Sequence, residues 1–152
     1  KSNPDIFINF VHSKNDKYLK DKKGVLAYAF YPKTQHQGKI VFNEDYLWTI
    51  NGKPIEAWKV DSRYDKSNKT KLRSYSLTHV MIHELGHSLG LTHDAMDKKS
   101  VMWWQYNKQM NLSSYDLLEI FKTSSSVRVF TLLFFSILSF AHISFENLFP
   151  MP

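Results

Sequence analysis

Short runs of β-branched and aromatic residues mark the first third of the chain. The segments 5–11 (DIFINFV), 25–31 (VLAYAFY) and 39–42 have this composition, and the first of them alternates apolar and polar positions. This pattern predicts three strands, with the first one buried. The stretch 12–24 is polar and rich in lysine, which is typical of a surface loop.

Further along, the pattern changes from strand to helix. Residues 49–70 contain Asn-Gly, a proline and many charges, so we expect loops with one hairpin at most. From about 74 to 89 the apolar positions recur at helical spacing, which predicts a helix. On a helical wheel His83 and His87 lie roughly opposite one core face, formed by Met81, Ile82, Leu85 and Leu89.

A second helix is predicted to begin near Ser113. Ser113 and Asp116 have the spacing of a capping box, and apolar residues follow them. The fold class that these elements predict is α/β (α+β), with a small twisted mixed β-sheet, a histidine-bearing helix and a C-terminal helix.

Composition limits the classes of function. The chain has 152 residues, about one domain, and its net charge of +6 is spread over scattered lysines. No dense basic arm is present, so no nucleic-acid partner is expected. Cysteine is absent, which excludes disulfides and thiolate metal ligands. The chain begins with Lys1 and shows no signal-peptide pattern, which indicates a processed product or a fragment.

The segment HELGHSLGLTHD carries the candidate chemistry. His83 and His87, four residues apart on one helix, can present two nitrogens to one ion. Gly90 can end the helix, so that His93 returns as a third ligand. Three histidines leave the fourth position of a zinc site open to water, whose pKa zinc lowers. Glu84 then lies where it can act as the catalytic general base.

This motif resembles the long zinc motif of the metzincin metalloproteases, and Met102 resembles the methionine of their Met-turn. Within that group the chain is most similar to the matrixins, the matrix metalloproteinase family, through segments such as 4–8 (PDIFI) and 25–30 (VLAYAF). The likeness runs from about residue 4 to 120. It implies a zincin-like catalytic domain over residues 1–122 and a secreted or extracellular zinc endopeptidase, expected as a monomer, acting on protein or peptide substrates.

The resemblance also assigns substrate contacts. Main-chain groups of Leu26 and Ala27 would bind an extended substrate as an added strand, and Tyr106 would line the pocket for the residue after the cut. Trp103 and Trp104 either reshape that pocket or belong to the core. His79 has no role in this assignment, and we expect it to be a partly exposed surface residue.

The chain departs from the family at its accessory metal sites. One catalytic zinc ion is expected, without the family's structural zinc, because two of its histidine ligands are replaced by Tyr28 and Val41. Acidic calcium ligands of the family fall on Lys39, Asn43 and Tyr46, which puts those calcium sites in doubt. A speculative interpretation is that Lys39 replaces the ion and pairs with Asp5.

A larger departure is at the start of the chain. Matrixin catalytic domains carry two strands and a helix before the 4–8 segment, so the sequence predicts an N-terminally truncated domain. Two alternatives to the enzyme therefore remain. One is an inactive zinc-binding remnant that acts as a binding module, and the other is a membrane-anchored structural protein in which HELGH is incidental.

Residues 123–152 no longer resemble the family. Residues 127–145 are about long enough to cross a bilayer, but Arg128 and His142 interrupt them. A membrane anchor, a lipid-anchor signal and non-native sequence are the three interpretations of this tail. The anchor predicts association with a membrane, whereas the lipid-anchor signal lacks the expected polar spacer.

Overall fold

The computed structural model describes residues 5–63, 66–67, 70–107, 109 and 112–123. One three-stranded sheet, two short strand pairs and the helices make up this part of the chain. The sheet consists of β1 (Phe7–Val11), β2 (Ala27–Ala29) and β3 (Lys39–Asn43), and the short 3-10 helix η1 (Ser13–Asn15) follows β1. The two longer helices are α2 (Leu77–Ser88) and α3 (Ser114–Thr123). The mixed α/β fold class predicted from the sequence is confirmed.

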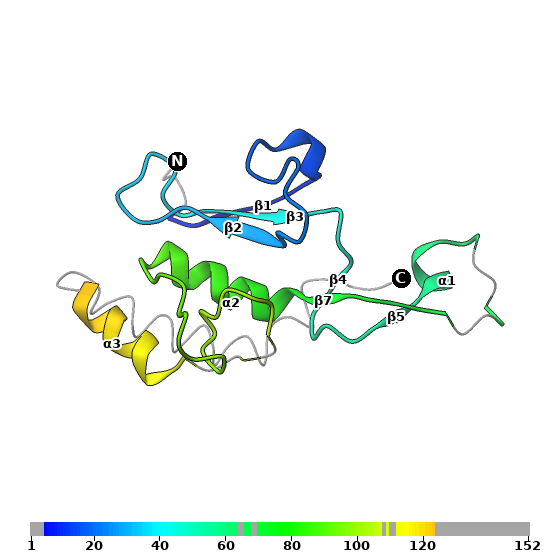
Figure 1. Cartoon of the computed structure of the whole chain (residues 1–152). Helices are drawn as coiled ribbons and strands as arrows, with labels where there is room; N and C mark the ends of the chain where they lie inside the picture. The colour runs from blue at the N-terminus through cyan, green and yellow to red at the C-terminus, as the bar shows by residue number, and fades with distance from the viewer. Residues whose placement is uncertain (1–4, 64–65, 68–69, 108, 110–111, 124–152) are drawn as a thin grey trace.

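The three-stranded sheet has the order β1-β3-β2. β1 runs parallel to β3 with Ile8 opposite Ile40, and β2 runs antiparallel to β3 with Tyr28 opposite Val41. The central strand is the most buried, because it has a neighbour on each side and α2 lies across one face (Figure 1). The three predicted strands are thus confirmed: the first two are shorter than predicted, and the third extends one residue further, to Asn43.

β1 is an exposed edge strand, so the prediction that it is buried was wrong. Phe7, Ile8 and Phe10 are 52%, 43% and 42% exposed. Within the described residues β1 pairs only with β3, and the ring of Phe10 stacks on that of Phe42 with centroids 5.1 Å apart. Apolar composition indicates a strand, but it does not show whether a second layer covers that strand.

α2 has two buried faces where the sequence predicted one. Val80 packs toward the sheet, in a cluster with Ile40 and Phe42. Ile82 packs on the other side with the C-terminal segment, and Leu85 contacts both clusters. The helix therefore lies between the sheet and the segment that carries α3 (Figure 1).

α2 begins three residues later than predicted because its N-cap is Ser76. The Ser76 hydroxyl accepts a hydrogen bond from the main-chain N–H of His79. Ser76 itself belongs to a short strand, and its N–H donates to the Tyr106 hydroxyl across 2.9 Å. Capping and strand pairing thus define the start of the helix.

The segment between the sheet and α2 contains small elements. β4 (Trp48–Thr49) runs parallel to β7 (Tyr75–Ser76), and β5 (Ile55–Glu56) runs antiparallel to β6 (Lys71–Leu72). The one expected hairpin corresponds to the β5–β6 pair, and the four-residue helix α1 (Ala57–Val60) was not predicted. Four residues are too few to give a recognisable helical period.

The predicted capping box at the start of α3 is confirmed. The Ser113 hydroxyl accepts from the N–H of Asp116, and the Asp116 carboxylate accepts from the N–H of Ser113. The Ser100 hydroxyl donates to the same carboxylate, which is fully buried. α3 is thereby joined to the segment that follows the third histidine.

Residues at the expected accessory-metal positions make contacts within the chain. The Asn43 side chain donates to the Val25 carbonyl, and the Tyr46 hydroxyl accepts from the N–H of Gly24. The expected ion pair between Lys39 and Asp5 is not present among the described residues. The charge of Lys39 acts instead on Asp16, whose pKa it helps to lower.

The predicted membrane-associated segment, residues 127–145, lies outside the described residues. Within the described part of the chain, no helix combines the length and the apolar composition that a bilayer span requires.

Candidate metal centre and substrate cleft

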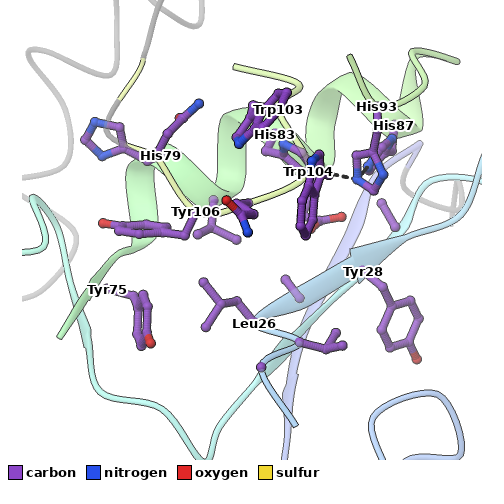
Figure 2. A pocket seen from close by; sticks show the side chains of 18 of the residues that line it. Leu26, Tyr28, Tyr75, His79, His83, His87, His93, Trp103, Trp104 and Tyr106 are labelled. Atoms are coloured by element: carbon purple, nitrogen blue, oxygen red, sulfur yellow. Dashed lines mark hydrogen bonds between the residues drawn. The ribbon is translucent and has the colours of Figure 1, made fainter. Parts of the chain in front are cut away.

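Three histidine side chains converge on one point above α2 (Figure 2). His83 and His87 project from the helix, and His93 comes from the loop that follows it. The Nε2 atom of His93 lies 3.2 Å from that of His83 and 3.1 Å from that of His87. Tetrahedral zinc with Zn–N bonds near 2.0–2.1 Å places its ligand nitrogens about 3.3–3.4 Å apart. The spacing therefore fits three nitrogens around one such ion.

Main-chain carbonyls orient two of the rings. The Nδ1 atoms of His83 and His87 lie 2.7 Å from the carbonyl oxygens of Val101 and Leu91, respectively. A carbonyl can only accept, so each Nδ1 carries the proton and each Nε2 keeps its lone pair for a metal. Backbone that is itself fixed by the fold thus sets the tautomer of both rings.

The third histidine is brought back by a tight turn and a bridge. Gly90 has φ +103°, and the N–H of Leu91 donates to the Gly86 carbonyl. Directly after His93, the N–H of Asp94 donates to the Met102 carbonyl across 2.9 Å. Met102 is fully buried next to Gly86, so the predicted Met-turn residue lies beneath the helix, and its carbonyl holds the loop that carries His93.

The environment favours neutral histidines. Burial lowers the pKa of His83 and lowers that of His87 to about 4, and the neighbouring imidazoles contribute to both shifts. Both rings are therefore uncharged at neutral pH, which is the form that binds metal.

Glu84 is buried beside the histidines. Its side chain is 4% exposed, and burial raises the pKa of its carboxyl to about 8. Its Oε2 atom is buried without a hydrogen-bond partner among the described residues. A carboxyl group in this state is poised to exchange a proton near neutral pH, which is a property of general acids and bases.

The histidines open into a cavity of about 820 Å³ with β2 along one side. The Leu26 carbonyl accepts from the N–H of Asn43 inside the sheet, so that carbonyl is not free for a substrate. Antiparallel pairing alternates, and the main-chain groups of Ala27 and Ala29 consequently point to the open edge. The structure places both predicted strand residues at the cavity, but Ala29 replaces Leu26 as a source of a free carbonyl.

The opposite side of the cavity carries aromatic side chains (Figure 2). Tyr106 lines it and packs edge-on against Tyr75 with ring centroids 5.1 Å apart. Trp103 and Trp104 also line it, and Trp104 is 57% exposed, so the alternative that it is a core residue was wrong. His79 is partly exposed, as expected, and it lies in the cavity wall.

Tyr31 is a residue near the site that the sequence did not indicate. Its hydroxyl lies 3.2 Å from Nδ1 of His87. Burial is the main cause that raises the pKa of Tyr31, and the charge of Glu84 is the second. Only its place at the end of the predicted strand 25–31 could have pointed to it. The orienting carbonyls of Val101 and Leu91 could not be found from side-chain types at all.

Comparisons with known proteins relate the chain to one family. A family model described as Matrixin matches residues 1–123. The chain is 37% identical over 107 residues to matrix metalloproteinase-2 of Drosophila melanogaster and 34% over 108 residues to interstitial collagenase of Oryctolagus cuniculus. It is 33% identical over 96 residues to human stromelysin-3.

These alignments cover unequal shares of the two partners. They include 68%, 70% and 62% of this chain, but only 12%, 19% and 16% of the respective relatives. The chain therefore corresponds to less than a fifth of each of these relatives.

Proposed function

This chain belongs to the matrixin family, and on that premise we propose that it is a zinc-dependent endopeptidase that hydrolyses peptide bonds in extended protein segments. The observation that carries the proposal is the convergence of three Nε2 atoms beside the buried carboxyl of Glu84. Metal-assisted peptide hydrolysis uses this pairing of a metal site with a proton acceptor.

His83, His87 and His93 would hold one zinc ion. Three nitrogen ligands fit zinc, and they leave the fourth tetrahedral position to water, as in catalytic zinc sites. Zinc bound there would supply Lewis acidity, lowering the pKa of a coordinated water to about 7 and polarising the substrate carbonyl.

Glu84 would carry the proton. Its carboxylate accepts a proton from the attacking water as the new C–O bond forms, and it donates that proton to the amine nitrogen as the C–N bond breaks. Burial supports this role, because a carboxyl whose pKa is near neutrality can both accept and release a proton.

The substrate would lie along β2 in the extended form. The outward main-chain groups of Ala27 and Ala29 would pair with it as a further strand, and Leu26 would contribute side-chain contact. Tyr106 would line the pocket for the residue after the cut. The position of that pocket between α2 and the edge strand supports this assignment.

Cleavage of a denatured protein by the full chain tests the proposal. We expect cleavage with added zinc, loss with a chelator and recovery when zinc is restored. Glu84→Gln should still bind zinc but lose about 10²–10⁴-fold in rate. Glu44→Gln, which changes an exposed glutamate, serves as the control and should cleave normally.

The same experiment distinguishes the alternative function. A chain that binds zinc and peptide but cleaves nothing would be a binding module, and the endopeptidase proposal would then be rejected. Unchanged cleavage by Glu84→Gln would reject Glu84 as the general base while leaving the enzyme class intact.

We also propose that the protein acts outside the cell. Two of its relatives are named for a matrix and for interstitial collagen, which supports this location. Secretion of the full-length gene product from its own cells, detected in the medium by an antibody, would test it.

A further inference from the structure

The cavity next to the histidines carries two cationic side chains at its lining, Lys23 and Arg73. Glu84 is the single carboxylate among the described residues that line this cavity, and it is buried beside the histidines. Both cations are exposed, and no ion pair joins either of them to a carboxylate in the described part of the chain. The cavity therefore has an uncompensated positive charge.

Contacts between aromatic residues place the two cations at the same end. The guanidinium of Arg73 lies over the ring of Tyr75, 5.1 Å from its centroid. Tyr75 packs edge-on against Tyr46 at 5.3 Å, and the Tyr46 hydroxyl accepts from the N–H of Gly24, directly after Lys23. One aromatic pair thus connects both basic residues.

This end is remote from His87. Lys23 precedes β2 and Arg73 precedes α2, whereas Tyr31, just after β2, lies against His87 near the end of α2. Figure 2 shows Tyr75 and His79 at the side of the cavity opposite His87 and His93. β2 and α2 thus lead from the basic end toward His87.

We propose that Lys23 and Arg73 form a subsite that binds acidic side chains of the polypeptide in the cleft. The assignment of this subsite to one side of the scissile bond rests on the proposed function. Tyr106 contacts Tyr75, so the pocket for the residue after the cut adjoins the basic end. The acidic residues would therefore lie further along, on the C-terminal side of the scissile bond.

Isosteric peptides can test this subsite without relying on cleavage. Two labelled peptides share one neutral sequence and carry either two Asp or two Asn residues at the third and fourth positions after the cut. Their affinities are measured by fluorescence anisotropy on the zinc-loaded full chain with Glu84→Gln, which keeps the peptides intact.

We expect the Asp peptide to bind about fivefold more tightly at low salt, as two partly exposed charge pairs allow. The difference should shrink below about twofold in 0.5 M salt, where the Debye length is about 4 Å. Lys23→Gln/Arg73→Gln should remove the preference.

Lys22→Gln/Lys71→Gln is the matched control. It removes an equal number of positive charges, two, from exposed residues outside the cavity lining. The preference for the Asp peptide should remain. If both double variants lose the preference for the Asp peptide equally, the preference comes from the net charge of +6, and the subsite is rejected. Equal affinities of the two peptides, or no binding of either, would also overturn it.

The two proposals fail in different ways. If the wild-type zinc-loaded chain binds the Asp peptide preferentially but cleaves neither peptide, the subsite stands and the endopeptidase proposal falls. If both peptides are cleaved at equal kcat/KM and bound equally, the enzyme stands and the subsite is rejected.

Discussion

Tyr28 donates a hydrogen bond from its hydroxyl to a carboxylate oxygen of Asp16 across 2.7 Å. The same carboxylate accepts from the main-chain N–H groups of Tyr18 and Leu19, and the Tyr28 ring packs against Tyr18 and Phe30. A side-chain hydrogen bond and an aromatic cluster thus join the loop before β2 to the sheet. They do so at a residue where the resemblance to matrixins expects a structural-zinc histidine.

Tyr28→Phe should lower the free energy of unfolding by about 1 kcal/mol, because a partly buried carboxylate loses one donor while the ring remains. Zinc content should stay at one ion per chain. Urea denaturation and metal analysis of the purified chain measure both. Tyr18→Phe is the control, since the Tyr18 hydroxyl has no recorded bond among the described residues; equal destabilisation by the two changes would contradict the prediction.

Asp16 should also make stability dependent on acid pH. Burial raises the pKa of its carboxyl, but the hydrogen bonds from Tyr28, Tyr18 and Leu19 outweigh burial and lower the pKa below its ordinary 3.8. A pKa that is lower in the folded chain stabilises the fold above 3.8 and loses that contribution as pH falls through the folded value. Urea unfolding from pH 6 to pH 2 should therefore show a smaller acid loss for Asp16→Asn than for wild type.

The matched control for this pH series is Asp21→Asn. Asp21 is an exposed carboxylate in the same loop, without a recorded hydrogen bond among the described residues. Its removal should leave the acid limb of the stability curve unchanged. Identical curves for Asp16→Asn and wild type would show that the carboxylate does not anchor the loop.

Local spacing explains which features the sequence could predict. His83 and His87 need only one helical period to share a side, and Ser113 and Asp116 need only one turn to cap each other. Gly90 indicates a turn without any tertiary contact. Each of these features depends on residues within a few positions along the chain.

Other features depend on which layers meet, and the sequence pattern does not contain that information. Ile8 lies in a segment whose composition is typical of a buried strand. In the structure β1 is an edge strand, and Ile8 is 43% exposed. Val80 and Ile82 are both buried because α2 contacts a layer on each side. The Leu26 carbonyl already accepts a hydrogen bond from the N–H of Asn43, and only the register between β2 and β3 reveals this pairing.

Glu84 should make the metal-free chain less stable as pH rises. Burial raises the pKa of this carboxyl from 4.5 to about 8, so the protonated form is favoured in the folded chain. The contribution of this carboxyl group to stability is therefore fully present below pH 4.5 and is lost as pH rises through about 8. Glu84→Gln cannot ionise, so in the presence of a chelator its melting temperature should exceed that of wild type increasingly between pH 5 and pH 9.

Glu44→Gln again provides the comparison, since Glu44 is exposed. It should follow the wild-type pH profile. A constant difference in melting temperature between Glu84→Gln and wild type at all pH values would indicate a packing effect and would contradict the assigned burial of the charge.

Gly86 and Met102 should be coupled through the packing beneath the histidines. A Cβ atom on Gly86 would lie 2.4 Å from Sδ and 3.1 Å from Cε of Met102, whose side chain is fully buried. Gly86→Ala must therefore displace that side chain, at a cost of about 1–3 kcal/mol from overpacking. The helix propensity of alanine offsets up to about 1 kcal/mol of this cost.

The displacement should reach the metal centre because the Met102 carbonyl accepts from the N–H of Asp94, next to His93. Gly86→Ala should thus weaken zinc binding, measured by competition with a chromophoric chelator. Met102→Ala alone should cost about 2–5 kcal/mol of stability. In the double variant the added methyl occupies space that the sulfur has left, so the double should be more stable than the sum of the single changes by about 0.5–3 kcal/mol. Strict additivity in urea denaturation would mean that positions 86 and 102 are not coupled through this packing contact.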